Sequence, residues 1–249
     1  MNTKYYLERI NYADPINPTF ETLSKLQLQH LLHVPFENLD IHNNIKIDLT
    51  NLFDKIAIRR RGGFCYELNG LFYQLLQELG FTVKMVSARV YDGKKDYSPE
   101  FDHMALIVKI KEDDYLADVG FGEFSFYPIK IELNKETADP RGIFKIETVD
   151  EKYTIIKKKN ADGDFIPEYM FSDMERRIDE FYGMCNYHQT NPASHFMQKR
   201  ICSLPAKNGR VTLTGDTLKI TENGEVKERK LNSEEEVRQE LWNYFGIRL

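Results

Sequence analysis

The chain has 249 residues, 41% of them hydrophobic and 29% charged, which is typical of a globular protein with a sizeable core or several small subdomains. Its net charge of −5 argues against a general nucleic-acid-binding protein, which usually carries a basic excess. Residues 1–9 lack the apolar core of a signal peptide, and no apolar run is as long as a membrane span. Cys65, Cys185 and Cys202 have no metal-ligand spacing. We therefore expect a cytoplasmic protein with reduced thiols, no bound metal and no membrane or nucleic-acid partner.

The first part of the chain is predicted to be helical. The Pro-Thr pair at 18–19 is typical of a helix start, and leucines at helical spacing predict a helix that ends near His33. Alternating apolar residues predict a short strand at 45–49, and a helix follows at 50–60. The arginines at 59–61 then fall at the C-terminal end of that helix, where cations interact favourably with the helix dipole.

A cysteine follows these arginines at the predicted start of the next helix, 65–79. Gly62 and Gly63 permit a tight turn, with positive φ if the turn requires it, and place Cys65 in the first helical turn. Unpaired backbone N–H groups and the helix dipole favour an anion there, and the pKa of a cysteine falls at helix N-termini and near cations. We interpret Cys65 as an activated nucleophile; the alternative is a small buried hydrophobic residue, the more common role of a free cysteine.

After Gly80 the apolar period changes from helical spacing to alternation, which predicts a middle part made mainly of strands and a mixed C-terminal part. Strands are predicted at 82–91, 103–110, 115–119, 143–149, 153–158, 210–214, 217–221 and 226–231, with helices at 172–188 and 233–245. Asp-Gly at 162–163 and Asn-Gly at 223–224 are typical of hairpin turns.

His103 is the histidine best placed to serve Cys65 as a base. It opens an apolar strand directly after a polar loop, whereas a surface or capping role is favoured for the other five histidines. Asp118 ends the next strand, and His103 and Asp118 are close to symmetric about the turn at 111–114. Antiparallel pairing would place them side by side, so that Asp118 fixes the tautomer of His103 and leaves its other nitrogen for Cys65. Alternatively, His103 bonds to water and Asp118 is an ordinary turn residue.

Several blocks of the sequence, in this order along the chain, resemble those of one family, the arylamine N-acetyltransferases. The blocks are PFENL at 35–39, RGGFCYELN at 61–69, HMAL at 103–106, DVGFG at 118–122, and SHF at 194–196 with GRVTL at 209–213. The resemblance implies that Cys65 accepts an acetyl group from acetyl-CoA, that His103 is its base and that Asp118 orients His103. It implies ping-pong transfer to a small aromatic amine or hydrazine.

The resemblance also implies an α+β fold and further site residues. The family fold has a helical subdomain, a β-barrel-like subdomain and an α/β lid around a Cys-His-Asp core like that of thiol proteases. With the predicted elements, this places the subdomains at 1–80, 81–190 and 191–249. It implies that Phe36 and Phe121 line the acceptor pocket.

Glu37 and Arg61 match a structural network beside the cysteine in that family. From the residues alone, we also consider that Glu37 pairs with one of the cations at 59–61; the alternative is a capped connection. Phe64 stands where many members carry Trp, and Val34 replaces a common Asn. The chain lacks the long insertion of vertebrate members, and in this respect it resembles a bacterial-type enzyme.

Two alternatives stay open at this point. The first is a thiol hydrolase with the same triad, although His103 follows Cys65 much more closely than the roughly 130–150 residues typical of papain-type proteases. The second is a degenerate member that only binds. The cations nearest the matching blocks are Lys94, Lys95, Lys207 and Arg210, and solvated surface charge is the favoured interpretation of each.

Overall fold

The computed structural model describes all of residues 1–249 and passes from a helical N-terminal part through a strand-rich middle to a mixed C-terminal part. The helical segments are α1 (Thr3–Arg9), α2 (Phe20–His33), α3 (Leu39–His42), the π-helical η1 (Asp54–Ile58), α4 (Cys65–Glu78), the 3₁₀-helical η2 (Ile178–Phe181), α5 (Tyr182–Thr190), α6 (His195–Gln198) and α7 (Glu234–Phe245).

The strands form two sheets. The strands are β1 (Phe36–Glu37), β2 (Thr82–Val90), β3 (His103–Ile110), β4 (Asp113–Ala117), β5 (Ile129–Lys130), β6 (Glu136–Asp139), β7 (Gly142–Thr148), β8 (Thr154–Lys159), β9 (Phe165–Phe171), β10 (Ile201–Ala206), β11 (Gly209–Thr214), β12 (Thr217–Glu222) and β13 (Glu225–Lys230).

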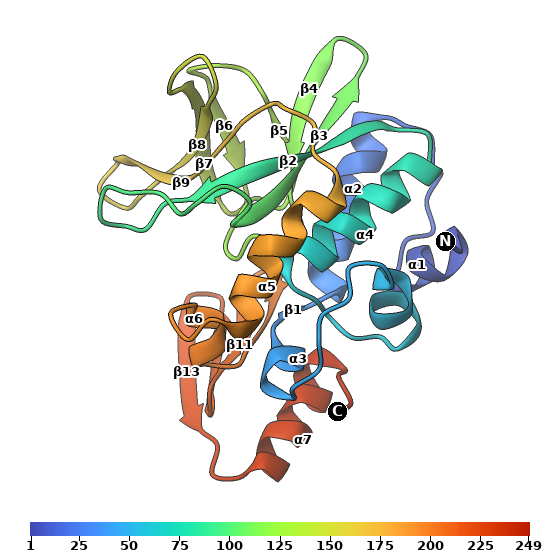
Figure 1. The fold of residues 1–249 in the computed structure, drawn as a ribbon, viewed down its shortest axis with the longest axis vertical. Helices are drawn as coiled ribbons and strands as arrows, with labels where there is room; N and C mark the ends of the chain where they lie inside the picture. Colours follow the sequence, from blue (N-terminus) through green and yellow to red (C-terminus); the bar gives the residue numbers. More distant parts are fainter.

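The larger sheet has eight antiparallel strands in the order β5-β4-β3-β2-β9-β8-β7-β6 and curves into a barrel-like layer (Figure 1). Within it β3 is covered on both faces, because successive side chains of a strand point to opposite sides. Met104 and Leu106 face the helices, in one core, while Ala105 and Ile107 belong to a second core inside the curved sheet. The larger sheet therefore separates two hydrophobic cores.

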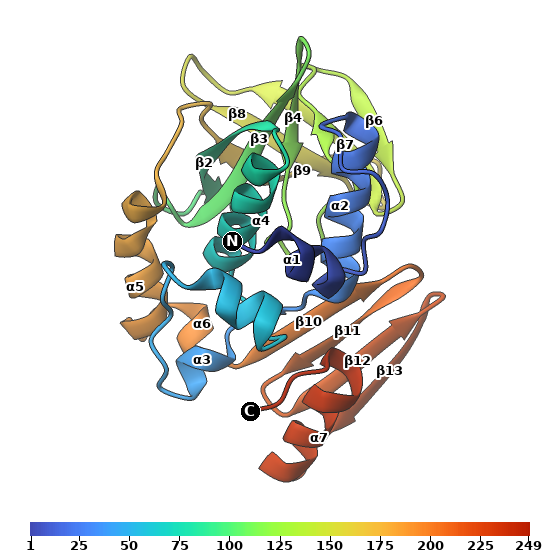
Figure 2. The ribbon, with the colours of Figure 1, turned by 90° about the vertical axis from the view of Figure 1, so that its right-hand side faces the viewer.

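Helices α2 and α4 lie beneath the larger sheet (Figure 2). The apolar residues of α4 recur at helical spacing, and Leu68, Phe72, Leu75 and Leu76 are fully buried in the core shared with β3. This packing fixes the direction of α4 and therefore the position of its first residue, Cys65, below the edge of the sheet.

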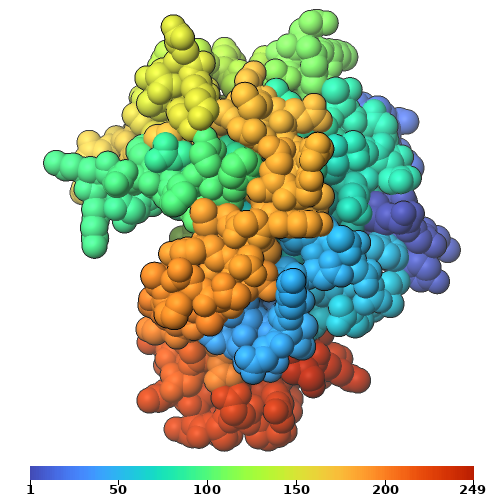
Figure 3. Space-filling model, in the orientation of Figure 1, coloured from blue at the N-terminus to red at the C-terminus, as the bar shows by residue number.

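The smaller sheet has five strands in the order β1-β10-β11-β12-β13, and α7 covers one face of it (Figure 1, Figure 2). Val237, Leu241 and Phe245 of α7 pack with Leu213 and Leu218 in a third core. Its first strand, β1, comes from the N-terminal part of the chain. In Figure 3, α5 and α6, coloured orange, cover the middle of the face between the larger sheet and the red C-terminal part.

Most predicted elements are confirmed. Helix α2 begins after Thr19, whose side chain accepts a hydrogen bond from the N–H of Thr22, and α7 begins after Ser233, which caps Glu236 in the same way. The hairpin turns at 162–163 and 223–224 join β8 to β9 and β12 to β13.

The predicted strand at 45–49 is wrong. Ile47 and Leu49 are buried in the helical core, but the segment pairs with no strand, and the N–H of Ile47 instead donates to Oε1 of Gln189 at 2.7 Å. Alternating burial here comes from a loop that crosses the core.

Two predicted helices are shorter than expected. The helix at 50–60 is a short segment that ends in the π-helical η1, and Arg60 has a left-handed backbone with φ 54°. The helix at 172–188 begins only at η2, because the N–H of Arg176 bonds to the carbonyl of Met85 at 2.8 Å and holds the preceding residues along β2. Met174, expected on a buried face, is 52% exposed.

Elements that the sequence did not predict are α1, α3, α6, β1, β5, β6, β9 and β10. Most are short, and β10 contains Pro205, which weakens the strand pattern. The subdomain boundaries at 1–80, 81–190 and 191–249 stay predictions. None of the helices is both long and apolar enough to cross a membrane.

Candidate active site

The two glycines before Cys65 are required by close contacts, of Gly62 with the backbone of Pro35 and of Gly63 with the side chain of Glu67. A Cβ on Gly62 would lie 2.1 Å from the carbonyl oxygen of Pro35. Gly63 exchanges hydrogen bonds with this segment, accepting from the N–H of Glu37 at 2.9 Å and donating to Pro35 at 3.2 Å. Neither glycine has a positive φ. The turn therefore presses the cysteine loop against β1, and Cys65, 4% exposed, begins α4 at that contact.

The cations before Cys65 do not activate it, contrary to the expectation from the sequence. Arg59 pairs with Asp54 at 2.8 Å, and Arg61 is held by carboxylates of its own. Burial raises the pKa of the Cys65 thiol well above its ordinary value, and the carboxylates of Asp102 and Asp118 act in the same direction. The expected lowering of the thiol pKa by neighbouring cations is not found, and Arg59 and Arg61 are each paired with carboxylates of their own.

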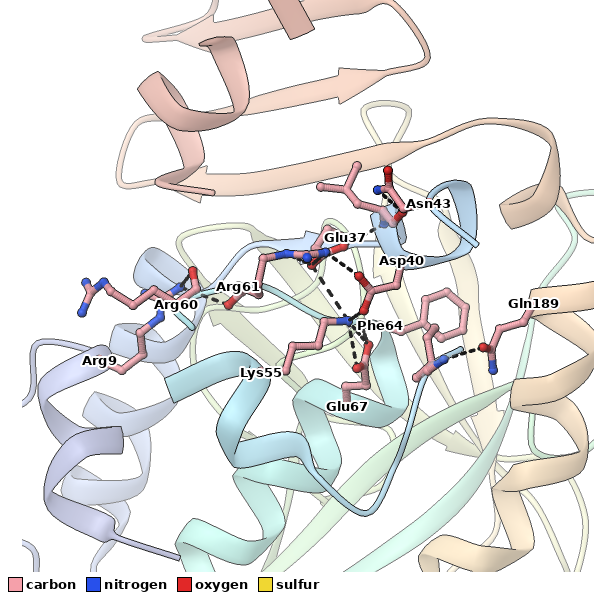
Figure 4. Close-up of polar contacts among 12 residues, drawn as sticks. Arg9, Glu37, Asp40, Asn43, Lys55, Arg60, Arg61, Phe64, Glu67 and Gln189 are labelled. Carbon is pink, nitrogen blue, oxygen red and sulfur yellow. Dashed lines mark hydrogen bonds and ion pairs between the residues drawn. The ribbon is translucent and has the colours of Figure 1, made fainter. Parts of the chain in front are cut away.

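Arg61 belongs to a buried network of charges beneath the cysteine loop (Figure 4). Its guanidinium contacts Glu37 and Asp40, each at 2.8 Å. Nζ of Lys55 lies 2.7 Å from Asp40 and 2.9 Å from Glu67, the third residue of α4. The pairing of Glu37 with a cation of the 59–61 run is confirmed. Lys55 and Glu67 had not been predicted as partners.

The network also organises the start of α4 and the end of β1. Oε2 of Glu67 accepts from the N–H of Phe64, the residue before the helix, at 2.9 Å. Oε2 of Glu37 accepts from the N–H of Leu39 at 2.7 Å. The charged side chains therefore fix the two segments that meet at the cysteine.

His103 and Asp118 form a buried pair, with Nε2 of His103 2.7 Å from Oδ2 of Asp118. Three more donors reach the same carboxylate: Nδ2 of Asn69 at 2.9 Å, the N–H of Gly120 at 2.9 Å and the hydroxyl of Tyr169 at 3.0 Å. Asp118, held by these donors, can keep the His103 ring in one orientation through Nε2 and leave Nδ1 free of that bond.

The pair does not arise from direct opposition across the strands, as the symmetry about 111–114 had suggested. Leu106 is opposite Ala117 in the ladder, so the ladder ends before His103 and Asp118 lies just beyond β4. The carboxylate reaches His103 along a diagonal, and Asn69 of α4 locks it by also donating to the carbonyl of Met104 at 2.7 Å. The predicted contact is confirmed, and the predicted register is wrong.

Cys65 and His103 line one cavity of about 390 Å³, and no hydrogen bond joins the two side chains. Phe36 and Phe121 also line this cavity, and their contact with an acceptor stays a prediction. Other lining residues are Asp102, Gly120, Glu123, His195, Phe196, Ser203, Arg210 and Thr212. The cavity thus joins a nucleophile, a carboxylate-paired imidazole and aromatic walls.

A second buried cluster next to the cavity had not been predicted. Nε2 of His188 lies 3.1 Å from Oδ1 of Asp102, and Nδ1 of His188 lies 3.0 Å from Oγ of Ser194. His188 and His30 are both buried, so the surface or capping role favoured for them is wrong. Asn69 ends the RGGFCYELN block at 61–69, but no role was predicted for it. Nothing in the local sequence marks His188 or Tyr169, since the aspartates that they contact lie far along the chain.

A buried cysteine at a helix start, in one cavity with a carboxylate-paired histidine, is the arrangement of enzymes that form a covalent thioester or related acyl intermediate. The fold and the site therefore define a thiol-dependent class of enzyme. Hydrolases and acyl transferases share this geometry, so the comparison with known proteins distinguishes them.

Residues 19–249 match the family model described as N-acetyltransferase. The arylamine N-acetyltransferase pineal gland isozyme NAT-3 of Gallus gallus is 32% identical over 279 aligned residues, covering 100% of this chain and 95% of that protein. The structure of the arylamine N-acetyltransferase from M. tuberculosis superposes with a TM-score of 0.90 at 29% identity, over 99% of this chain and 94% of that one. A Mycobacterium marinum arylamine N-acetyltransferase in complex with CoA gives a TM-score of 0.88 at 28% identity, over 99% and 93%.

The chain belongs to the arylamine N-acetyltransferase family. The family resemblance and the α+β fold predicted from the sequence are both confirmed, and bacterial enzymes are among the matching structures. The thiol hydrolase alternative is not favoured.

Proposed function

We propose that this protein transfers an acetyl group from acetyl-CoA, through a thioester on Cys65, to an aromatic amine or hydrazine. The observation that carries the proposal is the single cavity in which the buried Cys65 and the Asp118-paired His103 meet. The family to which the chain belongs, and the CoA complex of its Mycobacterium marinum relative, support acetyl-CoA as the donor.

In the first half of the reaction, His103 takes the proton of Cys65 and the thiolate attacks the acetyl carbonyl of acetyl-CoA. Nδ1 of His103 is the proton acceptor, because Nε2 is engaged by Asp118. Backbone N–H groups at the start of α4 stabilise the negative oxygen of the tetrahedral intermediate. The C–S bond to CoA then breaks, and the CoA sulfur leaves with the proton held by His103.

In the second half, the amine nitrogen of the acceptor attacks the thioester carbonyl. His103 takes the proton that the amine loses and returns it to the sulfur of Cys65 as the C–S bond breaks. The acetyl group leaves as an amide, and the enzyme is restored. Asp118 stabilises the imidazolium that forms in both halves.

We propose that Phe36 and Phe121 contact the aromatic ring of the acceptor, since both line the cavity beside Cys65. Glu37 and Arg61 act from outside the cavity: they hold β1 against the cysteine loop and so keep Phe36 and Cys65 in place. The three cysteines are unpaired, which supports a cytoplasmic setting.

The test is intact-mass spectrometry after the protein is mixed with acetyl-CoA alone. We expect one added acetyl group, which an added arylamine removes while an acetylated arylamine appears. Cys65→Ala should show no added group, whereas Cys202→Ala, which replaces a buried thiol outside the cavity, should be acetylated like the parent. Rapid loss of the acetyl group to water, with no acetylated amine, would instead identify a hydrolase.

A further inference from the structure

We propose that Arg210 forms an oxyanion-binding subsite in the wall of the cavity, which binds an acidic group of the acceptor, such as a carboxylate, or a phosphate of acetyl-CoA. The inference rests on the proposed function, because it assigns part of the substrate of the same cavity. Among the lining residues, Arg210 is the only lysine or arginine.

Arg210 is held rigidly by the smaller sheet. It lies in β11, paired with Pro205 of β10 on one side and Thr221 of β12 on the other. Its side chain is 12% exposed, so the guanidinium lies within the cavity wall and does not extend into solvent. The solvated surface charge favoured for this residue from the sequence is therefore wrong.

The hydrogen bonds of Arg210 orient its guanidinium without neutralising it. Nη1 donates to Oγ of Ser203 at 2.7 Å and Nη2 donates to the carbonyl of Gly122 at 2.7 Å. Both acceptors are neutral, and Nε is buried with no hydrogen-bond partner. A buried cation without a paired anion is costly, and a guanidinium presents donors that match a carboxylate or phosphate.

The nearest carboxylate is a weak competitor for this position. Oε1 of Glu123 lies 3.7 Å from Nε of Arg210, and the Glu123 side chain is 73% exposed. The Glu123 carboxylate is solvated and too far from Nε for a hydrogen bond, so a ligand oxyanion can displace it into solvent. Burial lowers the pKa of Arg210 to about 10, and Arg141 acts in the same direction, so the guanidinium remains charged at neutral pH.

The rest of the cavity suits an aromatic ligand with two polar ends. Phe36, Phe121 and Phe196 line the same cavity as Cys65 and Arg210 and supply its apolar walls, with the rings of Phe36 and Phe196 6.1 Å apart. A ligand pocket of this kind binds the apolar body broadly and selects by its few polar groups. An aromatic amine that carries an acid fits this arrangement, with the amine toward Cys65.

The acceptor arm of the test compares 4-aminobenzoate with 4-aminobenzamide, which has nearly the same shape and no charge. In Arg210→Gln we expect kcat/KM for 4-aminobenzoate to fall about 10-fold or more, the effect of losing one charged hydrogen bond, with less than about 2-fold change for the amide. Glu123→Gln removes the competing carboxylate, so it should raise the ratio of kcat/KM for 4-aminobenzoate to kcat/KM for 4-aminobenzamide. Because Glu123 is exposed, this second variant tests the subsite even where Arg210→Gln folds poorly.

The donor arm measures the rate at which Cys65 is acetylated, by intact mass, with acetyl-CoA and with S-acetyl-pantetheine, which lacks the phosphates. If Arg210→Gln slows only the reaction with acetyl-CoA, by about 10-fold or more, the bound oxyanion is a CoA phosphate. A selective loss in either arm supports the subsite and identifies its source.

The control variant is Arg200→Gln, since Arg200 also lies by the smaller sheet and donates to a backbone carbonyl, that of Gly215, but lines no part of the cavity. It should leave unchanged both the ratio of kcat/KM for 4-aminobenzoate to that for 4-aminobenzamide and the ratio of the acetylation rates with acetyl-CoA and with S-acetyl-pantetheine. Equal losses for charged and neutral substrates in Arg210→Gln, or no loss in either arm, would overturn the subsite and leave acetyl transfer intact. Failure of the parent to acetylate either amine would instead count against the proposed function itself.

Discussion

The surroundings of Cys65 favour the protonated, neutral form of its thiol. Burial raises its pKa, the carboxylates of Asp102 and Asp118 act in the same direction, and Arg59 and Arg61 are paired with other carboxylates. A helix N-terminus favours a thiolate but acts only over the first turn and is modest in size. Under the proposed mechanism, reactivity at neutral pH comes from proton transfer to His103, which lines the same cavity and is hydrogen-bonded to the Asp118 carboxylate.

When His103 is replaced by Gln, the reactivity of Cys65 should follow the raised pKa of its thiol. We expect alkylation of Cys65 by iodoacetamide to slow by about 10-fold or more at pH 7, and then to rise about tenfold per pH unit up to pH 9 because the thiolate fraction does so below the pKa. The measurement is peptide mapping in a Cys185→Ala, Cys202→Ala background, so that only one thiol reacts.

The parent protein in the same background is the control, and its profile should be flatter over this pH range. If His103→Gln is alkylated at pH 7 as fast as the parent, the thiolate forms without the imidazole, and the role given to His103 is wrong.

At the scale of single residues, the candidate catalytic side chains were easier to predict than the residues that hold them in position. Cys65 and Asp118 could be chosen because a cysteine at a helix start and an aspartate at a strand end have few other uses together. Tyr169 could not, since it reaches Asp118 only through folding and lies in no recognised pattern, and Asn69, although it lies in the block at 61–69, gave no sign of its contact with Asp118. The same holds for Lys55, which looks like an ordinary helical lysine in the sequence.

Between elements, the buried network fixes how η1, α3, β1 and α4 meet (Figure 4). It holds the cations of Lys55 and Arg61 against the carboxylates of Glu37, Asp40 and Glu67. Burial raises the pKa of Glu67, although Lys55 opposes the shift. The carboxylates outnumber the cations, so the network depends on Lys55, which touches all three.

Lys55→Met should therefore destabilise the protein strongly. Removing one partner of a buried ion pair leaves uncompensated charge and costs about 3–5 kcal/mol. Urea unfolding at pH 7.5 should show this loss. The loss should be smaller at pH 5, because the carboxylates freed of Lys55 are more easily protonated and a neutral acid costs less to bury.

Lys4→Met is the matched control, because the Lys4 side chain is 83% exposed in a surface pair with Glu8 and should change stability by less than about 1 kcal/mol. Glu37→Gln keeps the shape of the side chain and leaves the network with equal numbers of cations and carboxylates. Its loss in the free energy of unfolding should therefore be smaller than that of Lys55→Met. Equal stability of Lys55→Met and the parent at pH 7.5 would show that the network does not hold these elements.

Element prediction succeeded where local pattern and packing agree. The leucine spacing of α4 describes the face that it buries, the apolar run of β3 matches a strand covered on both faces, and the bounds of α4, β2 and β3 are nearly those predicted. The strand predicted at 45–49 is wrong because alternating apolar residues indicate which side chains are buried and not whether the backbone pairs with another strand. Strands β1 and β10 failed because β1 has two residues and becomes a strand only by pairing with a segment far along the chain.

At the scale of the whole molecule, one buried histidine connects stability to pH. His30 of α2 is fully buried against Tyr6 of α1 and Phe72 of α4, with Nδ1 2.7 Å from the Tyr6 hydroxyl. Burial lowers its pKa to about 3, and the positive charge of Arg9 acts in the same direction. Because His30 lies among α1, α2 and α4 in the core beneath the larger sheet, the folded protein disfavours a proton on its ring.

The sign of the effect follows from where the proton binds. Below about pH 6.5 the unfolded chain protonates this histidine while the folded chain does not, so stability is complete above that pH and is lost as pH falls toward 3. The loss from His30 is up to about 1.4 kcal/mol per pH unit, or about 2 kcal/mol between pH 6.5 and pH 5. Replacing His30 by Leu together with Tyr6 by Phe removes the titrating ring without leaving a buried hydroxyl unpaired.

Urea unfolding at pH 7, 6, 5 and 4.5 should therefore give a flatter pH dependence for the double variant than for the parent. Tyr6→Phe alone keeps the buried ring and should keep the parent slope, even though it loses one hydrogen bond and its stability is lower at every pH. Parallel curves for the double variant and the parent would mean that His30 accepts its proton within the folded protein. In that case the acid sensitivity of the fold would have to come from the carboxylates of the network around Lys55.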